Sequence, residues 1–247
     1  MSSKSRKSGA NIALNKIRGI IFDLDNTLYL YEPAHRAGIV ASHKKYPIKQ
    51  SLAKFTEKYN VARDKNESEL FGTGSSHNRL LYFQKMLETD NCFSPNTALE
   101  LARAYWIAFI TGMKLEPQLR ETLLLLVRKY KLGILSDLTA DIQFAKLTAH
   151  RLWPFFDAIV TSEEVGVEKP SKIGIKLLLK KMNLRANQVI IVGDNPMNDG
   201  LCAKKLGIPF IQIIRSDIKQ KIPGVVAWRK IKKLPELQKV LLLKRTK

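Results

Sequence analysis

The chain has 247 residues, of which 45% are hydrophobic, so it can bury one large core or a core plus a smaller unit. Its formal net charge of +20 suits phosphorylated small molecules, nucleic acid or anionic lipid as partners. No apolar stretch approaches the roughly 20 residues that span a bilayer, and the basic N-terminus has no apolar region behind it. We therefore expect neither a membrane partner nor a secretory signal.

The positive residues are densest at the two ends, without the interleaved aromatic residues of a base-stacking surface, so specific nucleic-acid binding is not expected. Cys92 and Cys202 lie far apart and lack His neighbours at metal-binding spacing. We expect no disulfide, no zinc site and a cytoplasmic location. The cause of the high charge and the oligomeric state are left open.

The first half of the chain contains one strand pattern followed by helical patterns. Residues 1–15 have no periodicity and are expected to form a mobile basic tail. Residues 18–24 are predicted to form a buried parallel strand, because an apolar run from Gly19 to Phe22 leads into the carboxylates Asp23 and Asp25. From 30 to 115 there is no strand signal, and this range is predicted to be a separate helical cap domain. Its expected helices cover 36–46, 47–59, 75–87 and 95–111.

From Pro117 onward, helix and strand patterns alternate. The expected helices are 117–130, 140–150, 171–182, 196–206 and 234–244; the expected strands are 131–136, 158–161, 189–194 and 209–214, with one more short strand at 225–228. This alternation predicts an α/β fold with a doubly wound, Rossmann-like parallel sheet. Residues 16–29 and 116–247 would form this core domain, with the helical cap inserted between them.

Polar residues gather at the ends of these strands, which parallel topology brings to one edge of the sheet. They are Asp23, Asp25, Ser136, Lys169, Asp194 and Asp199. Clustered carboxylates repel each other unless a cation is present, and Mg²⁺ is the usual choice beside a phosphate. The Ser and Lys donors suit phosphoryl oxygens. The set therefore predicts phosphoryl transfer through an aspartyl-phosphate.

The chain resembles the haloacid dehalogenase-like superfamily of phosphohydrolases, on four motifs in order. The first is Asp-x-Asp-x-Thr after a hydrophobic strand, at 23–27. The second is the Ser that ends the strand 133–136. The third is the Lys in Gly166-Val167-Glu168-Lys169-Pro170, and the fourth is Gly-Asp followed by Asn-Asp, at 193–199. One such motif is a moderate signal, whereas four in order are a strong one.

The resemblance implies a role for each motif residue. Asp23 would be the nucleophile, and Asp25 the general acid and then the general base. Asp23, the backbone carbonyl of Asp25, and Asp194 would hold Mg²⁺, and Asp199 would support the ion through water or from behind these ligands. Ser136, Asp137 and Lys169 would bind the phosphoryl group, and Thr27 would brace the loop of the nucleophile.

Three further features bear on the reaction. An Asp at position 25 favours phosphoryl chemistry over carbon–halogen cleavage, because dehalogenases of the family lack it. The inserted helices resemble the family's type 1 cap, which closes over small soluble substrates and excludes macromolecules. Asp137 stands where many relatives have Asn, and Gly200 where a branched apolar residue is common; neither change removes a reacting group.

Cap residues are candidates for substrate contacts. His77, Asn78 and Arg79 follow a Gly-rich loop at 72–76, and Arg79 could bind an anionic substrate group. The alternative is an ordinary helix start with a solvated Arg. Trp106, Tyr82 and Phe83 are interpreted as the core of the cap.

The predicted function is Mg²⁺-dependent hydrolysis of a small phosphorylated metabolite, such as a sugar phosphate or nucleotide. A phosphomutase of the same superfamily is the alternative, because the motifs do not show whether water takes the phosphoryl group. A non-catalytic, nucleic-acid-associated protein with the same fold is a third hypothesis, against which the intact set of reacting residues counts. The substrate itself is not readable from the sequence.

Overall fold

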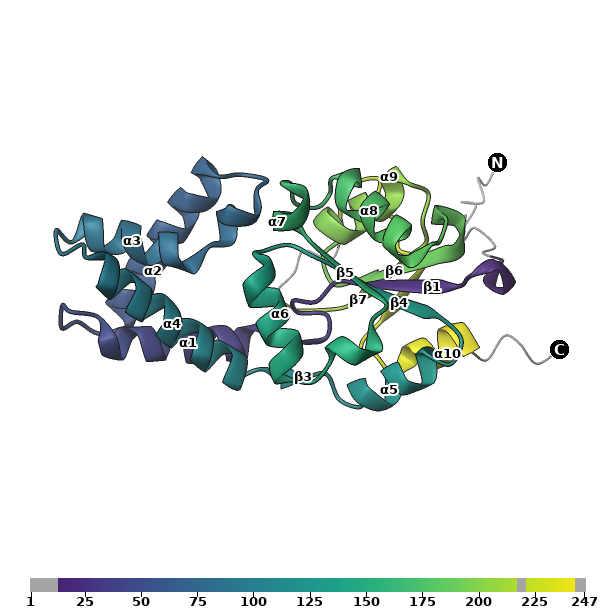
Figure 1. Cartoon of the computed structure of the whole chain (residues 1–247), viewed down its shortest axis with the longest axis horizontal. Coiled ribbons are helices and arrows are strands. Elements are labelled where there is room, and N and C mark those ends of the chain that lie inside the picture. The colour runs from purple at the N-terminus through teal and green to yellow at the C-terminus, as the bar shows by residue number, and fades with distance from the viewer. Residues whose placement is uncertain (1–12, 217–220, 243–247) are drawn as a thin grey trace, which may run out of the picture.

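A computed structural model describes residues 13–216 and 221–242 of the chain (Figure 1). Its centre is a six-stranded parallel sheet with the strand order β5-β4-β1-β6-β7-β8. The strands are β1 (Gly19–Phe22), β4 (Lys131–Ser136), β5 (Ala158–Thr161), β6 (Val189–Gly193), β7 (Phe210–Ile213) and β8 (Arg229–Ile231). Most of the predicted tail at 1–15 lies outside the described residues.

Strand β1 lies in the interior of the sheet, and all four of its residues are buried. It is apolar on both faces, as a parallel strand covered by helices on both sides must be. Phe22 at its end pairs with Ile134 of β4 and with Val192 of β6. The residues that follow these three strands therefore meet at one edge.

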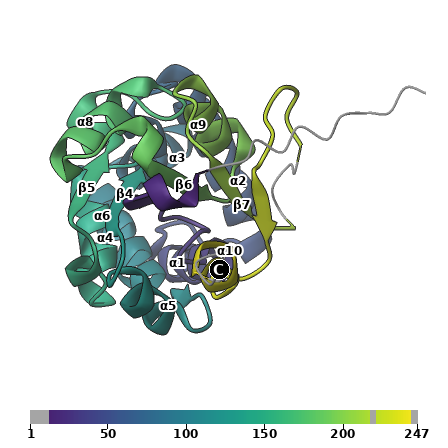
Figure 2. The same cartoon turned by 90° about the vertical axis from the view of Figure 1, so that its right-hand side faces the viewer.

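Helices cover both faces of the sheet (Figure 2). Apolar side chains of α5 (Leu119–Leu126), α6 (Ala140–Ala149) and α10 (Glu236–Leu242) belong to one buried cluster. Those of α8 (Lys172–Met182) and α9 (Leu201–Lys205) belong to a second cluster on the other face. The predicted doubly wound α/β fold is confirmed. None of the helices in the described ranges is long and apolar enough to cross a membrane.

Four helices pack on one another beyond the carboxyl ends of the strands: α1 (Tyr31–Lys45), α2 (Leu52–Glu69), α3 (Arg79–Thr89) and α4 (Pro95–Thr111) (Figure 1). We call them the cap helices. Their shared core is aromatic and includes Phe55, Tyr59, Tyr82, Phe83 and Tyr105, all fully buried. Ring contacts such as the stacked pair Tyr59–Tyr105 join helices from different parts of the segment. The domain boundaries at 30 and 115 stay a prediction.

Two strands were not predicted from the sequence. β2 (Tyr29–Leu30) and β3 (Lys114–Leu115) pair antiparallel where the chain enters and leaves the cap helices. A two-residue strand is too short to show a period, which is why the pattern gave no sign of it. The pairing ties the two connections together at the base of the cap helices.

Several predicted boundaries were wrong. Helix α1 begins at Tyr31, with a proline in its first turn, and not at 36. Helix α2 begins after Ser51, whose hydroxyl accepts the Lys54 N–H, and extends to Glu69, well beyond 59. The last strand lies at 229–231 and not at 225–228. These boundaries are set by helix caps and by strand pairing, and the spacing of apolar residues does not show either of them.

The predicted helix at 196–206 is divided in two. Pro196–Gly200 form a π-helical turn, and α9 follows it. The carbonyl of Asn195 accepts the N–H groups of both Asp199 (2.8 Å) and Gly200 (3.3 Å), which widens the first turn. This turn places Asp199 at the sheet edge. The predicted helix at 234–244 begins only at Glu236, and residues 243 and 244 lie outside the described range.

Candidate active site

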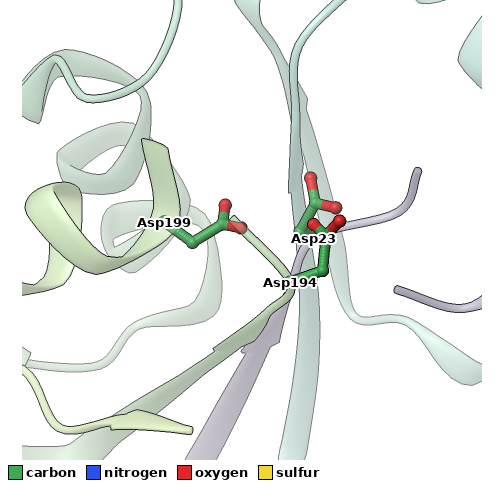
Figure 3. Close-up of side chains that lie close together, drawn as sticks. All are labelled: Asp23, Asp194 and Asp199. Carbon is green, nitrogen blue, oxygen red and sulfur yellow. The ribbon is translucent and has the colours of Figure 1, made fainter. Parts of the chain in front are cut away.

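Three carboxylates meet at the carboxyl edge of the sheet (Figure 3). Asp23 follows β1, Asp194 follows β6, and Asp199 lies in the π-helical turn. One oxygen of each lies within 4.8 Å of the other two, and all three residues are buried. Strand register and the widened turn together bring residues that are far apart in the sequence to one point.

Short-range contacts hold the three carboxylates in place. Thr27 donates to Oδ2 of Asp23 (3.1 Å), as expected for a bracing residue. Asn26 has a positive φ of 61° and donates its amide to Oδ2 of Asp194 (2.9 Å). Asp199 packs so closely on Gly193 that a Cβ there would lie 2.2 Å from its Oδ2. Glycine is therefore required at the end of β6.

Lys169 joins two of the carboxylates. It lies between α7 (Ser162–Val165) and α8, and its Nζ is 2.5 Å from Oδ1 of Asp23 and 2.7 Å from Oδ1 of Asp199. Burial opposes its charge, but Asp199 and Asp23 raise the pKa of Lys169 well above its usual value. Asp137 accepts the backbone N–H of Lys169 (2.9 Å), so it orients this loop as well as lining the cavity.

The carboxylates do not ionise easily without further positive charge. Burial raises the pKa of Asp23 well above its usual range despite the opposing charge of Lys169. Burial and the neighbouring charge of Asp199 raise the pKa of Asp194 to about 7. A buried set of carboxylate oxygens at this spacing fits a hard divalent cation, which would remove this repulsion.

Asp25 belongs to a separate group of contacts that sequence reasoning missed. Lys146 of α6 places its Nζ 2.6 Å from Oδ1 of Asp25, and Gln143 donates to Oδ2 (2.7 Å). Tyr29 donates its hydroxyl to Oδ1. Burial favours the neutral acid, but the charge of Lys146 and the hydrogen bonds outweigh it and lower the pKa of Asp25 to about 2.

Ser136 lies beside this group. Its hydroxyl is buried, 3.4 Å from Oδ2 of Asp25, and accepts a hydrogen bond from Gln143 (2.7 Å). The sequence pattern gave no sign of the missed residues. Gln143, Lys146 and Leu147 have the spacing of one helix face, but two of these three buried residues are polar, so the pattern does not identify that face as buried.

A cavity of about 880 Å³ connects these residues with the cap helices. Asp23, Asp25, Lys169, Asp194 and Asp199 line it on the sheet side. The cap side contributes Tyr31, His35, Arg63, His77, Arg79 and Trp106. The cavity has the size of a small-molecule site, and both parts of the chain form its walls.

The three cap candidates have different surroundings. Arg79 is 6% exposed and lines the cavity, so it is not a solvated helix-start residue. His77 also lines it and contacts Glu67 and Glu168. Asn78 does not line it; its side chain accepts the Leu80 N–H and caps α3. Trp106, interpreted as core, is half-buried and reaches the cavity.

Comparison with known proteins gives a consistent result. The family model described as haloacid dehalogenase-like hydrolase matches residues 20–213. Ribulose-1,5-bisphosphate 5-phosphatase of Halopiger xanaduensis is 36% identical over 200 residues, which cover 78% of this chain and 82% of that protein. Glyceraldehyde 3-phosphate phosphatase of Methanocaldococcus jannaschii is 30% identical over 214 residues, covering 82% and 87%.

A similar fold occurs among solved structures. The HAD-hydrolase YfnB of Bacillus subtilis, bound to magnesium, superposes with a TM-score of 0.73 at 21% identity, covering 92% of this chain and 99% of that one. The family match spans the four motifs and most of the sheet. The chain therefore belongs to the haloacid dehalogenase-like hydrolase family.

Proposed function

We propose that the chain hydrolyses the phosphate monoester of a small phosphorylated metabolite, with Mg²⁺ as cofactor and Asp23 as the nucleophile. One observation carries the proposal. The Asp23 carboxylate lines the cavity in contact with the ammonium of Lys169 and within 4.8 Å of the carboxylates of Asp194 and Asp199. A carboxylate in that setting is suited to form an aspartyl-phosphate.

The neighbouring residues would divide the remaining tasks. Asp23, Asp194, Asp199 and the backbone carbonyl of Asp25 would hold Mg²⁺, which neutralises charge on the transferring phosphoryl group when bound. Lys169 lies close enough to Asp23 to contact a phosphoryl group on it. Ser136 and Asp137 would bind the same group from the end of β4. Thr27 keeps the Asp23 carboxylate oriented.

Asp25 would move the protons. Its surroundings favour the carboxylate, which is the form that accepts a proton from the attacking water. Donation to the leaving alcohol requires the protonated form, which the contact with Lys146 opposes. The base half of the predicted acid–base role is thus better supported than the acid half.

Sugar phosphates are the substrate class that we favour. The similar proteins are named for ribulose-1,5-bisphosphate, glyceraldehyde 3-phosphate and phosphoglycolate, all short phosphorylated compounds. A compound of that size fits a cavity of about 880 Å³. Closure of the cap helices over it would exclude bulk water from the site.

The test uses p-nitrophenyl phosphate and Mg²⁺ with the wild type, Asp23→Asn and Asp141→Asn. Asp141 is an exposed carboxylate in the first turn of α6 and serves as a matched control. We expect turnover by the wild type and the control only. Mass spectrometry of acid-quenched protein should locate a phosphoryl adduct on the peptide with Asp23. Undiminished turnover by Asp23→Asn would remove it as the nucleophile.

A further inference from the structure

Arg79 is a buried cation without an acidic partner. It is 6% exposed, and within the described ranges no carboxylate oxygen lies within 4.0 Å of its guanidinium. A buried charge is strongly disfavoured unless an opposite charge or several hydrogen bonds compensate it. Every other buried Lys or Arg side chain of the site, Lys146 and Lys169, has a carboxylate in contact.

The contacts of Arg79 are incomplete. Nη1 donates to the His77 carbonyl (2.5 Å) and Nη2 to the Tyr31 hydroxyl (2.6 Å). A guanidinium has five N–H donors, and Nε is buried without an acceptor among the described residues. Glu67, an acidic residue on the same wall, is instead in contact with His77 and Tyr82.

Aromatic rings position the guanidinium and leave its charge in place. Its Cζ lies 5.1 Å from the centroid of Trp106, 5.4 Å from Tyr82 and 5.6 Å from Tyr105. Such rings stabilise a cation in part, and the Tyr105 hydroxyl also interacts with it, but none of these groups carries a negative charge. Because Arg79 lines the cavity, a ligand there can supply oxygen acceptors and a negative charge to its Nη groups.

The same Trp106 ring relates Arg79 to the reaction centre. It lies 5.4 Å from Nζ of Lys146, which in turn contacts Asp25. Arg79 and Lys146 thus lie against the same indole ring, and Lys146 contacts Asp25. Because Arg79 and Asp23 line the same cavity, one small molecule can present an anion to each of them.

We propose that Arg79 binds a second anionic group of the substrate, a carboxylate or a phosphate that is not transferred. This inference rests on the proposed function and specifies its substrate: a short compound with one anion at Asp23 and another at Arg79. The chemistry shared by both kinds of group is a set of oxygen acceptors facing a planar guanidinium.

Two matched pairs of compounds test the proposal. 3-Phosphoglycerate and glycerol 3-phosphate differ in a terminal carboxylate, and ribulose 1,5-bisphosphate and ribulose 5-phosphate differ in a second phosphate. The quantity measured is the ratio of kcat/KM for the member with the second anionic group to that for the member without it. This ratio cancels any loss of correctly folded enzyme. The pair with the higher wild-type ratio identifies the anion as carboxylate or phosphate.

The variants are Arg79→Met, Arg79→Lys and Arg63→Gln. Arg63 also lines the cavity, but it already has Asp64 at 2.9 Å, so it controls for positive charge as such. In Arg79→Met we expect the ratio to fall by about 10- to 100-fold, the usual effect of losing a hydrogen-bonded charge. Arg79→Lys should retain part of the ratio, and Arg63→Gln should leave it unchanged.

Other outcomes have distinct meanings. If Arg79→Met lowers kcat/KM equally for both members of each pair, or if the wild type prefers neither, Arg79 is a structural residue and the proposal is wrong. A fall of the same size in Arg63→Gln would indicate a diffuse charge effect and also overturn it. Binding of the same compounds to Asp23→Asn, measured by calorimetry, does not depend on turnover. It therefore distinguishes failure of the proposed hydrolysis from failure of the proposed role of Arg79.

Discussion

Lys146 and Asp25 form an ion pair, with Nζ of Lys146 2.6 Å from Oδ1 of Asp25, the lysine side chain 1% exposed and the aspartate side chain 28% exposed. The lysine also lies over the rings of Phe109 and Trp106, which belong to α4. One side chain of the core thus contacts both a motif carboxylate and the cap helices.

Replacing Lys146 with Met should destabilise the protein by about 2 kcal/mol, because a carboxylate that is only partly exposed then loses its cation. Urea unfolding measures the change. The control is the same replacement in an Asp25→Asn background, where residue 25 carries no charge that Lys146 could balance, and the cost should be clearly smaller. An equal cost in both backgrounds would mean that Lys146 acts through packing alone.

Asp25→Asn tests the proton-transfer role by comparing leaving groups. An alkyl alcohol needs a proton as it departs, whereas p-nitrophenolate does not. If Asp25 donates that proton, the variant should lose about 100-fold more activity on glycerol 3-phosphate than on p-nitrophenyl phosphate. If Asp25 acts only as a base for water, both substrates should lose activity alike in the dephosphorylation step. Steady-state rates for the two esters distinguish these results.

Removal of metal should abolish the activity. We expect EDTA to stop hydrolysis of p-nitrophenyl phosphate and excess Mg²⁺ to restore it, because the buried carboxylates need a cation. Asp194→Asn removes one ligand charge and should raise the Mg²⁺ concentration required for half-maximal rate by about 10-fold or more. Asp157→Asn, a change at the opposite end of the sheet, is the control. Full activity in EDTA would contradict the metal requirement.

The strand-end residues were predictable because topology alone brings them together. Asp23 and Asp194 each follow an apolar run, and parallel strands place both at one edge. Lys169 was predicted to face the same edge. Its contact with both Asp23 and Asp199 was not predicted, because it depends on the π-helical turn, and such a turn has no recognisable pattern of apolar residues in the sequence.

The contacts between the cap helices and the sheet could not be predicted in the same way. Lys146 looks like a solvated helix residue until α4 is known to pack against α6. The burial of Arg79 could not be predicted either, because it depends on the packing of Tyr82, Tyr105 and Trp106 around it. The periodicity of apolar residues identifies the apolar face of a helix. It does not show which polar side chains will be buried when the cap helices pack against the sheet domain.

His77 provides a pH-dependent contact between the cap helices and the sheet side. Its Nδ1 lies 3.2 Å from Glu67 and its Nε2 3.3 Å from Glu168, which follows α7. Burial and Arg79 oppose protonation, but the hydrogen bond to Glu67 and the charge of Glu168 raise the pKa of His77. A raised pKa stabilises the fold fully below the unfolded value of about 6.5, and this stability is lost as the pH rises through the folded value.

The free energy of unfolding of the wild type minus that of His77→Gln should therefore be largest near about pH 5.5 and decline by about pH 8.5. We expect at most about 1 kcal/mol, because His77 is partly exposed and salt screens the pair. Burial keeps the pKa of Glu168 above its usual value, so the difference should shrink again at lower pH as that partner gains a proton. His150→Gln is the control, since its Nε2 contacts only the Ile110 carbonyl. Urea unfolding at several pH values in this range measures the difference in unfolding free energy between the wild type and His77→Gln. If that difference does not change with pH, the imidazole makes its contacts without a charge.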